Sequence, residues 1–180
     1  MNNRQKMIFV AATLLLTVVA RLLPHPANFT PVAAMALFGG ALVNRKWLSV
    51  FAIVLAMGIS DILLNSWVYN MPFQLSYFTD TMTVGVYLGI LSMVVLGWFF
   101  KPSTASHKNL LGFSLSSSLL FWTISNFFCW PGNPLYSQDA GGLIHCYVAA
   151  LPFLGSVIGD LIFCSLFYYA FHFYSKRAIA

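Results

Sequence analysis

The chain has 180 residues, of which 59% are hydrophobic, 17% aromatic and only 7% charged. This composition excludes an ordinary soluble domain and predicts an all-α integral membrane protein with a single transmembrane domain over residues 1–180. The formal net charge of +5 is interpreted as a topology signal, because no basic cluster with interleaved aromatic residues indicates binding to nucleic acid.

Several apolar runs approach the roughly 20 residues that cross a hydrocarbon core of about 30 Å. The first run follows Arg4 and Lys6 as in a signal peptide, but no convincing small-residue cleavage site comes after it, so we expect a retained helix. The second run is short and crosses the core only if its ends are buried in protein. Pro152 divides the last apolar stretch into a short approach helix and a final span. The six predicted spans cover residues 6–23, 31–43, 47–65, 81–100, 109–128 and 152–174.

The distribution of lysine and arginine predicts the orientation of these spans. Six spans place eight of the nine basic residues on one side of the membrane and leave Arg21 on the other. Because basic residues in short loops favour the cytoplasm, both termini are predicted to be cytoplasmic. The eight residues are Arg4, Lys6, Arg45, Lys46, Lys101, Lys108, Lys176 and Arg177.

The stretch RLLPHPANFTPVAAMALFGG, residues 21–40, organises the predicted bundle. Pro24 and Pro26 end the first helix, since proline lacks an amide hydrogen and restricts the residue before it. Asn28 and Thr30 are predicted to cap the second helix, with Pro31 in its first turn. The small residues that follow predict a helix face that packs closely against another helix or a partner. This face consists of Ala33, Ala36, Gly39 and Gly40.

Asp61 and Asp160 are predicted to lie inside spans, where a carboxylate costs on the order of 3 kcal/mol. Both fall in the outer half of the six-span arrangement, and Arg21 is the nearest cation. We therefore expect Arg21, Asp61 and Asp160 to form one cluster, either as a structural tie between helices or as part of a ligand site. The sequence has no metal-ligand spacing such as CxxC or HExxH, so it predicts neither an enzyme nor a bound metal or cofactor.

The outer loops carry no lysine or arginine and are rich in amides and aromatic rings. Aromatic residues at a membrane surface often serve only as anchors, but amides crowded with them favour a pocket for a flat, polar, vitamin-sized molecule. A disulfide between Cys129 and Cys146 is left open, and cobalamin is one candidate ligand because Cys129 or His145 would approach its cobalt. The residues predicted from these loops to contact a ligand are Asn28, Trp67, Asn70, Asn126, Trp130 and Asn133.

Four stretches resemble a known family. They are RLLPHPANFTPVAAMALFGGA, the pair Ser60 and Asp61 late in the third span, SNFFCW at the end of the fifth, and GGLIHCYVAALPFLGSVIGDLIF leading into the sixth. Together they resemble uncharacterised bacterial membrane proteins related to the substrate-binding S-components of energy-coupling factor transporters. The resemblance covers nearly the whole chain.

The resemblance implies a six-helix bundle in the bacterial inner membrane that binds a vitamin or cofactor precursor near the outer face for uptake. It also implies that Asn28, Phe29, Thr30 and Pro31 border the pocket and that residues 33–40 face a coupling protein or another helix. The chain has no ATP-binding motif, so pumping requires separate ATPase subunits, although a solitary or self-associated form is the other arrangement implied. The alternative function is that of a structural or assembly membrane protein without transport activity.

Overall fold

The computed structural model describes residues 2–26, 29–72, 74–151 and 155–177. Every regular element within these ranges is helical, which confirms the predicted all-α class. Four helices are long and apolar enough to cross a membrane, namely Asn3–Leu22, Lys46–Val68, His107–Cys129 and Ser156–Lys176. The elements are α1 (Asn3–Leu22), α2 (Val32–Leu42), α3 (Lys46–Leu63), the π-helical η1 (Leu64–Val68), the 3-10 helix η2 (Leu75–Thr79), α4 (Thr81–Gly97), α5 (His107–Cys129), α6 (Ala140–Ala149) and α7 (Gly155–Arg177).

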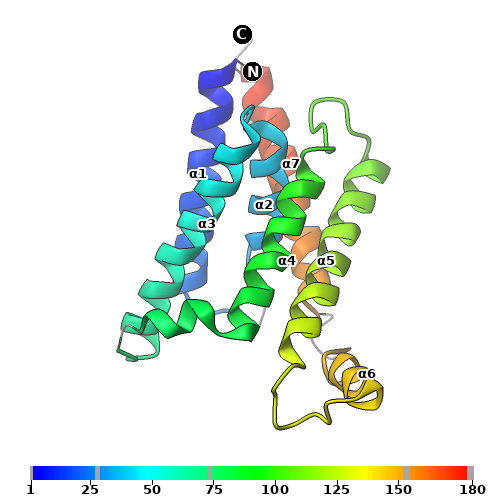
Figure 1. Cartoon of the computed structure of the whole chain (residues 1–180). Helices are drawn as coiled ribbons and strands as arrows, with labels where there is room; N and C mark the ends of the chain where they lie inside the picture. The colour runs from blue at the N-terminus through cyan, green and yellow to red at the C-terminus, as the bar shows by residue number, and fades with distance from the viewer. Residues whose placement is uncertain (1, 27–28, 73, 152–154, 178–180) are drawn as a thin grey trace.

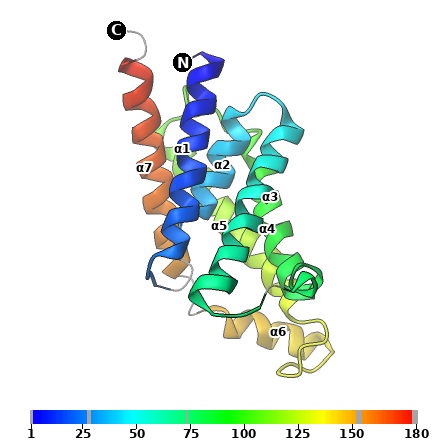
Figure 2. The same cartoon turned by 90° about the vertical axis from the view of Figure 1, so that its left-hand side faces the viewer.

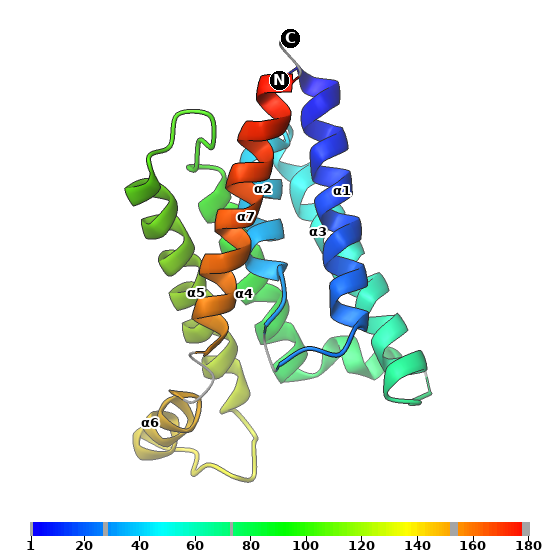
Figure 3. The ribbon, with the colours of Figure 1, turned by 180° about the vertical axis from the view of Figure 1, so that it is seen from behind.

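The helices α1, α2, α3, α4, α5 and α7 form an elongated bundle, and α6 lies apart at one end of it (Figure 1). The start of α1 and the end of α7 lie at the same end, together with the α2–α3 and α4–α5 connections (Figure 3). We call this the terminal end. The α1–α2 connection, η1, η2 and α6 lie at the opposite end, which we call the far end (Figure 1). Lys46 opens α3 and Lys108 lies in the first turn of α5, so basic residues gather at the terminal end.

The helix α2 forms the centre of the bundle, where it contacts α1, α3, α4, α5 and α7 (Figure 2). Nine of its 11 residues are buried, as its short length requires. A Cβ atom added at Gly40 would lie 2.3 Å from the carbonyl oxygen of Val94 on α4, so only glycine permits this approach. The small face predicted from the sequence is therefore used for helix packing inside the chain. Its residues Ala33, Ala36, Gly39 and Gly40 are all buried.

Large apolar side chains cover the outside of the long helices. Leu15 on α1, Phe51 on α3, Leu119 on α5 and Leu166 on α7 are all exposed. Soluble monomers rarely expose apolar surface on every side, whereas lipid accepts it. The fold is thus a helical bundle suited to a membrane, although α2 and α4, with 11 and 17 residues, are shorter than a full span.

Several helix ends differ from the predicted bounds by up to three residues. The helix α3 continues through η1 to Val68 instead of ending near residue 65. The helix α4 ends at Gly97, because the next residues close into tighter turns in which Phe100 donates to the Gly97 carbonyl at 3.0 Å. The predicted capping of α2 by Thr30 is wrong, since Pro31 is the N-cap residue and its side chain makes no capping hydrogen bond. Asn28, the other predicted cap, lies outside the described residues.

Candidate functional site

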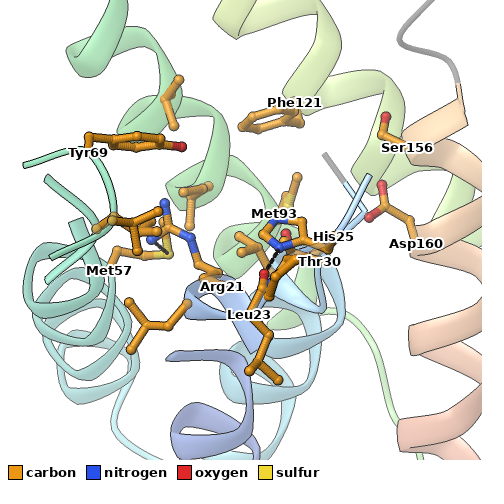
Figure 4. A pocket seen from close by; sticks show the side chains of 18 residues that line it. Arg21, Leu23, His25, Thr30, Met57, Tyr69, Met93, Phe121, Ser156 and Asp160 are labelled. Atoms are coloured by element: carbon orange, nitrogen blue, oxygen red, sulfur yellow. Dashed lines mark hydrogen bonds between the residues drawn. The ribbon is translucent and has the colours of Figure 1, made fainter. Parts of the chain in front are cut away.

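A cavity of about 610 Å³ lies toward the far end of the bundle, between α1, α2, α3, η1, α4, α5 and α7 (Figure 4). Ligand pockets typically measure about 300–1,000 Å³, so a vitamin-sized molecule is within its capacity. The wall is mostly apolar and contains a few polar groups. The lining residues are Arg21, Leu22, Leu23, Pro24, His25, Thr30, Val32, Ala33, Met57, Leu64, Val68, Tyr69, Val86, Ile90, Met93, Phe121, Ser156 and Asp160.

Arg21 reaches the cavity from the last turn of α1 and is held there by an ion pair. Its Nη2 atom lies 2.6 Å from Oδ1 of Asp61 on α3, and its Nη1 atom donates to the Ser60 hydroxyl. The Tyr87 hydroxyl on α4 donates to the other oxygen of Asp61 at 2.7 Å. The side chains of Asp61 and Arg21 are 4% and 16% exposed. The charge of Arg21 is therefore compensated inside the bundle, and the network joins α1, α3 and α4.

Asp160 faces the cavity from α7, on the side opposite to Arg21 (Figure 4). Its Oδ2 atom accepts a hydrogen bond of 2.6 Å from the Ser118 hydroxyl on α5. The residue is 8% exposed, and among the residues that the structure describes no basic side chain pairs with it. The expected three-residue cluster is thus divided, because the cavity lies between Asp160 and the pair formed by Arg21 and Asp61.

The rest of the wall combines soft apolar groups with a polar edge from the α1–α2 connection. Thr30 lines the cavity, and His25 is oriented by a 2.6 Å contact from Nδ1 to the carbonyl oxygen of Leu23 (Figure 4). Because a carbonyl can only accept, Nδ1 carries the hydrogen in this contact. Thioethers and aromatic rings accommodate a flat apolar body. These side chains are Met57, Tyr69, Met93 and Phe121.

The residues predicted to contact a ligand divide between the cavity and the loops. Thr30 lines the cavity, while Asn28 lies outside the described residues. Trp67 and Asn70 follow α3 but point elsewhere, with Trp67 72% exposed. The intervening Tyr69 lines the cavity instead. A helical connection presents neighbouring residues in different directions, so only part of this aromatic cluster can face one pocket.

The other three predicted residues bond within the end of α5 and the loop after it. The Asn126 amide donates to the Trp122 carbonyl at 2.7 Å, and the Trp130 indole donates to the Ser137 carbonyl at 2.8 Å. Asn133 accepts a 3.0 Å hydrogen bond from a backbone amide of the same loop. These side chains stabilise the local turn, and they are not among the described residues that line the cavity.

The same loop ends in a firm cap for α6. The Gly142 amide, at 2.8 Å, and the Ser137 hydroxyl, at 2.9 Å, both donate to Asp139. These bonds hold the pKa of the Asp139 carboxyl below its usual range, so the cap is charged at neutral pH. Cys129 and Cys146 are free thiols in this structure, and the Cys146 thiol donates to a backbone carbonyl of α5.

Comparison with known proteins gives a family for the chain. A family model matches residues 1–180 and is described as a family of unknown function (DUF6580). The chain belongs to this family. No curated protein and no solved structure matches the chain significantly. Membership in DUF6580 therefore identifies relatives but supplies no substrate or partner.

Sequence reasoning missed two residues that hold charged groups at the cavity of this DUF6580 protein. Tyr87 lies on the inner side of α4 and bonds to Asp61, while Ser118 on α5 bonds to Asp160. A serine and a tyrosine within apolar helices carry no pattern that names their partners, because the partners lie 42 and 26 positions away. Only the requirement that buried carboxylates be hydrogen-bonded points to such residues.

Proposed function

We propose that this protein is a membrane-embedded binding subunit for the uptake of a small molecule, with the cavity as its binding site. The observation that carries the proposal is a cavity of about 610 Å³ with charged groups on opposite walls. Charged side chains inside a bundle are costly and commonly mark ligand pathways. The size and the ring-lined wall favour a vitamin or cofactor precursor.

The proposed orientation follows from the charges at the two ends of the bundle. Basic residues gather at the terminal end, which we infer to be cytoplasmic, with six helices crossing the inner membrane. The cavity then opens toward the outer face. The helices α2 and α4 are shorter than a full span, so the backbone that flanks them would complete each crossing, which is acceptable because neighbouring helices cover it.

The resemblance to S-components supports the same function and suggests how transport is driven. In that arrangement a separate coupling protein and ATPases supply the energy. The central face of α2 is buried in this chain, so we infer that any coupling protein contacts another surface of the bundle. A protein that acts alone or as a self-associated form needs no surface for a coupling protein.

Binding is tested by thermal unfolding of the purified, ligand-free protein in the presence of each water-soluble vitamin. A ligand at about 100 times its dissociation constant stabilises the fold by roughly 2.7 kcal/mol. Two neighbouring aromatic residues provide a matched comparison. Tyr69→Ala is expected to abolish the stabilisation, because Tyr69 lines the cavity, whereas Trp67→Ala is expected to retain it. A folded protein that responds to no vitamin would instead indicate a structural membrane protein.

A further inference from the structure

The cavity contains unbalanced charge. Arg21 is neutralised by Asp61 at 2.6 Å, and its Nη1 atom is bonded to Ser60. Asp160 has the Ser118 hydroxyl on one oxygen and, within the described part of the chain, no basic partner. Counted at formal charge, the pair and the lone carboxylate together leave one negative charge facing the cavity.

An unpaired carboxylate that is 8% exposed is unfavourable inside an apolar bundle. The Ser118 hydroxyl fills part of the hydrogen-bonding capacity of Asp160 but does not neutralise its charge. A cation placed in the cavity would supply both the missing charge and further donors. Charge-assisted hydrogen bonds of this kind are roughly twice as strong as those between neutral groups.

We propose that the ligand carries one positive charge, as a protonated amine or amidine attached to a flat apolar body. The proposal rests on the binding function inferred above and names its substrate class. The cationic group would donate to Asp160, while the body would lie among Tyr69, Phe121 and the two methionines of the wall. Cations also interact favourably with aromatic faces, which adds to the preference.

Anionic ligands and metal ions fit less well than an organic cation. An anionic ligand would have to compete with Asp61 for Arg21, whose ion pair is already short. A metal ion needs several ligands, and the described residues contain no group of three or more histidine, cysteine or acidic side chains able to hold one. An organic cation needs only the one carboxylate and the ring-lined space.

Two sets of probes test the charge of the ligand at constant shape. Pyridoxamine, pyridoxine and 4-pyridoxate differ in one substituent, as do tryptamine, tryptophol and indole-3-acetate. Equilibrium dialysis against the purified full-length protein measures their dissociation constants. The amine of each set is expected to bind at least about tenfold more tightly than the neutral alcohol, with the acid weakest.

Asp160→Asn supplies the second measurement, because asparagine keeps an oxygen for Ser118 but removes the charge. In this variant the ratio of the dissociation constants of the alcohol and the amine should fall to about 1. Asp80→Asn is the matched control: Asp80 is an exposed cap of α4 outside the cavity, and asparagine also caps. This variant should keep the preference. If Asp160→Asn does not fold, the order in which the unchanged chain binds the amine, the alcohol and the acid still decides the question.

Equal or tighter binding of the alcohol or the acid would overturn the inference while leaving the proposed function intact. The same holds if the vitamin screen finds a ligand that is neutral or anionic. Absence of binding by every probe and every vitamin would instead overturn the binding function, and the charge inference with it.

Discussion

Removing one member of the pair between Arg21 and Asp61 should destabilise the protein more than removing both. The pair is short, at 2.6 Å, and Asp61 is only 4% exposed. Arg21→Met leaves the carboxylate of Asp61 buried with the Tyr87 hydroxyl but without its cation. Asp61→Leu leaves the guanidinium of Arg21 with the Ser60 hydroxyl but without its carboxylate. In both single variants an uncompensated charge stays inside the bundle.

The magnitudes follow from these contacts. Breaking a buried pair on one side costs about 3–5 kcal/mol of unfolding free energy, whereas replacing both charges by apolar groups is often neutral. The double variant also leaves the Tyr87 hydroxyl without its acceptor, which costs about 1–3 kcal/mol. Ser60 keeps its 2.9 Å bond to the Met57 carbonyl. The coupling free energy between the two substitutions is therefore at least about 3 kcal/mol.

Unfolding by sodium dodecyl sulfate in mixed micelles measures these free energies for the unchanged chain and the three variants. Arg45→Met and Asp80→Asn form a control pair of exposed residues at opposite ends of the bundle. Their effects should add within about 0.5 kcal/mol. Additive losses for Arg21→Met and Asp61→Leu as well would refute the reasoning, because they would show that neither charge depends on the other.

Two further predictions concern packing and topology. Gly40→Ala places a Cβ atom 2.3 Å from the Val94 carbonyl oxygen and should cost at least about 1–3 kcal/mol of unfolding free energy. The control is Gly112→Ala, whose Cβ atom would have no neighbour within 4 Å, and it should be neutral or stabilising by up to about 1 kcal/mol. Equal effects of the two substitutions would contradict the close packing of α2. A cysteine replacing Ser103, in the α4–α5 connection, should react with an impermeant maleimide only after cells are opened; labelling of intact cells would contradict the orientation.

The sequence predicts the helical architecture well because its signals are local. Apolar runs indicate the long helices, and prolines indicate where α1 ends and α2 begins. Because the run of small residues in α2 is too short to cross the membrane alone, the sequence also predicts that this helix is buried in protein, and the structure places it at the centre of the bundle. Helix ends were harder to place, since π and 3-10 turns extend or tighten the last turn without a strong sequence signal.

The site was less accessible to sequence reasoning because it depends on side-chain direction. Aromatic and amide residues were grouped by their loops, yet Tyr69 lines the cavity while Trp67 and Trp130 do not. The charged residues were a better guide. Each ionisable group inside a helix had to be paired or hydrogen-bonded, and both Asp61 and Asp160 have such partners.

The difference between the two carboxylates is what connects the fold to a function. Asp61 lies behind Arg21, bonded on both oxygens, so its charge is used to hold α1, α3 and α4 together. Asp160 has only a neutral partner and faces the cavity, so its charge stabilises nothing within the described part of the chain. A bundle held by packing and, in its described part, by one ion pair gains no stability from a second, uncompensated carboxylate, whereas a binding site for a cation gains affinity from it. Under the proposed function, the two aspartates, similar in sequence context, therefore divide into one structural residue and one residue that binds the ligand.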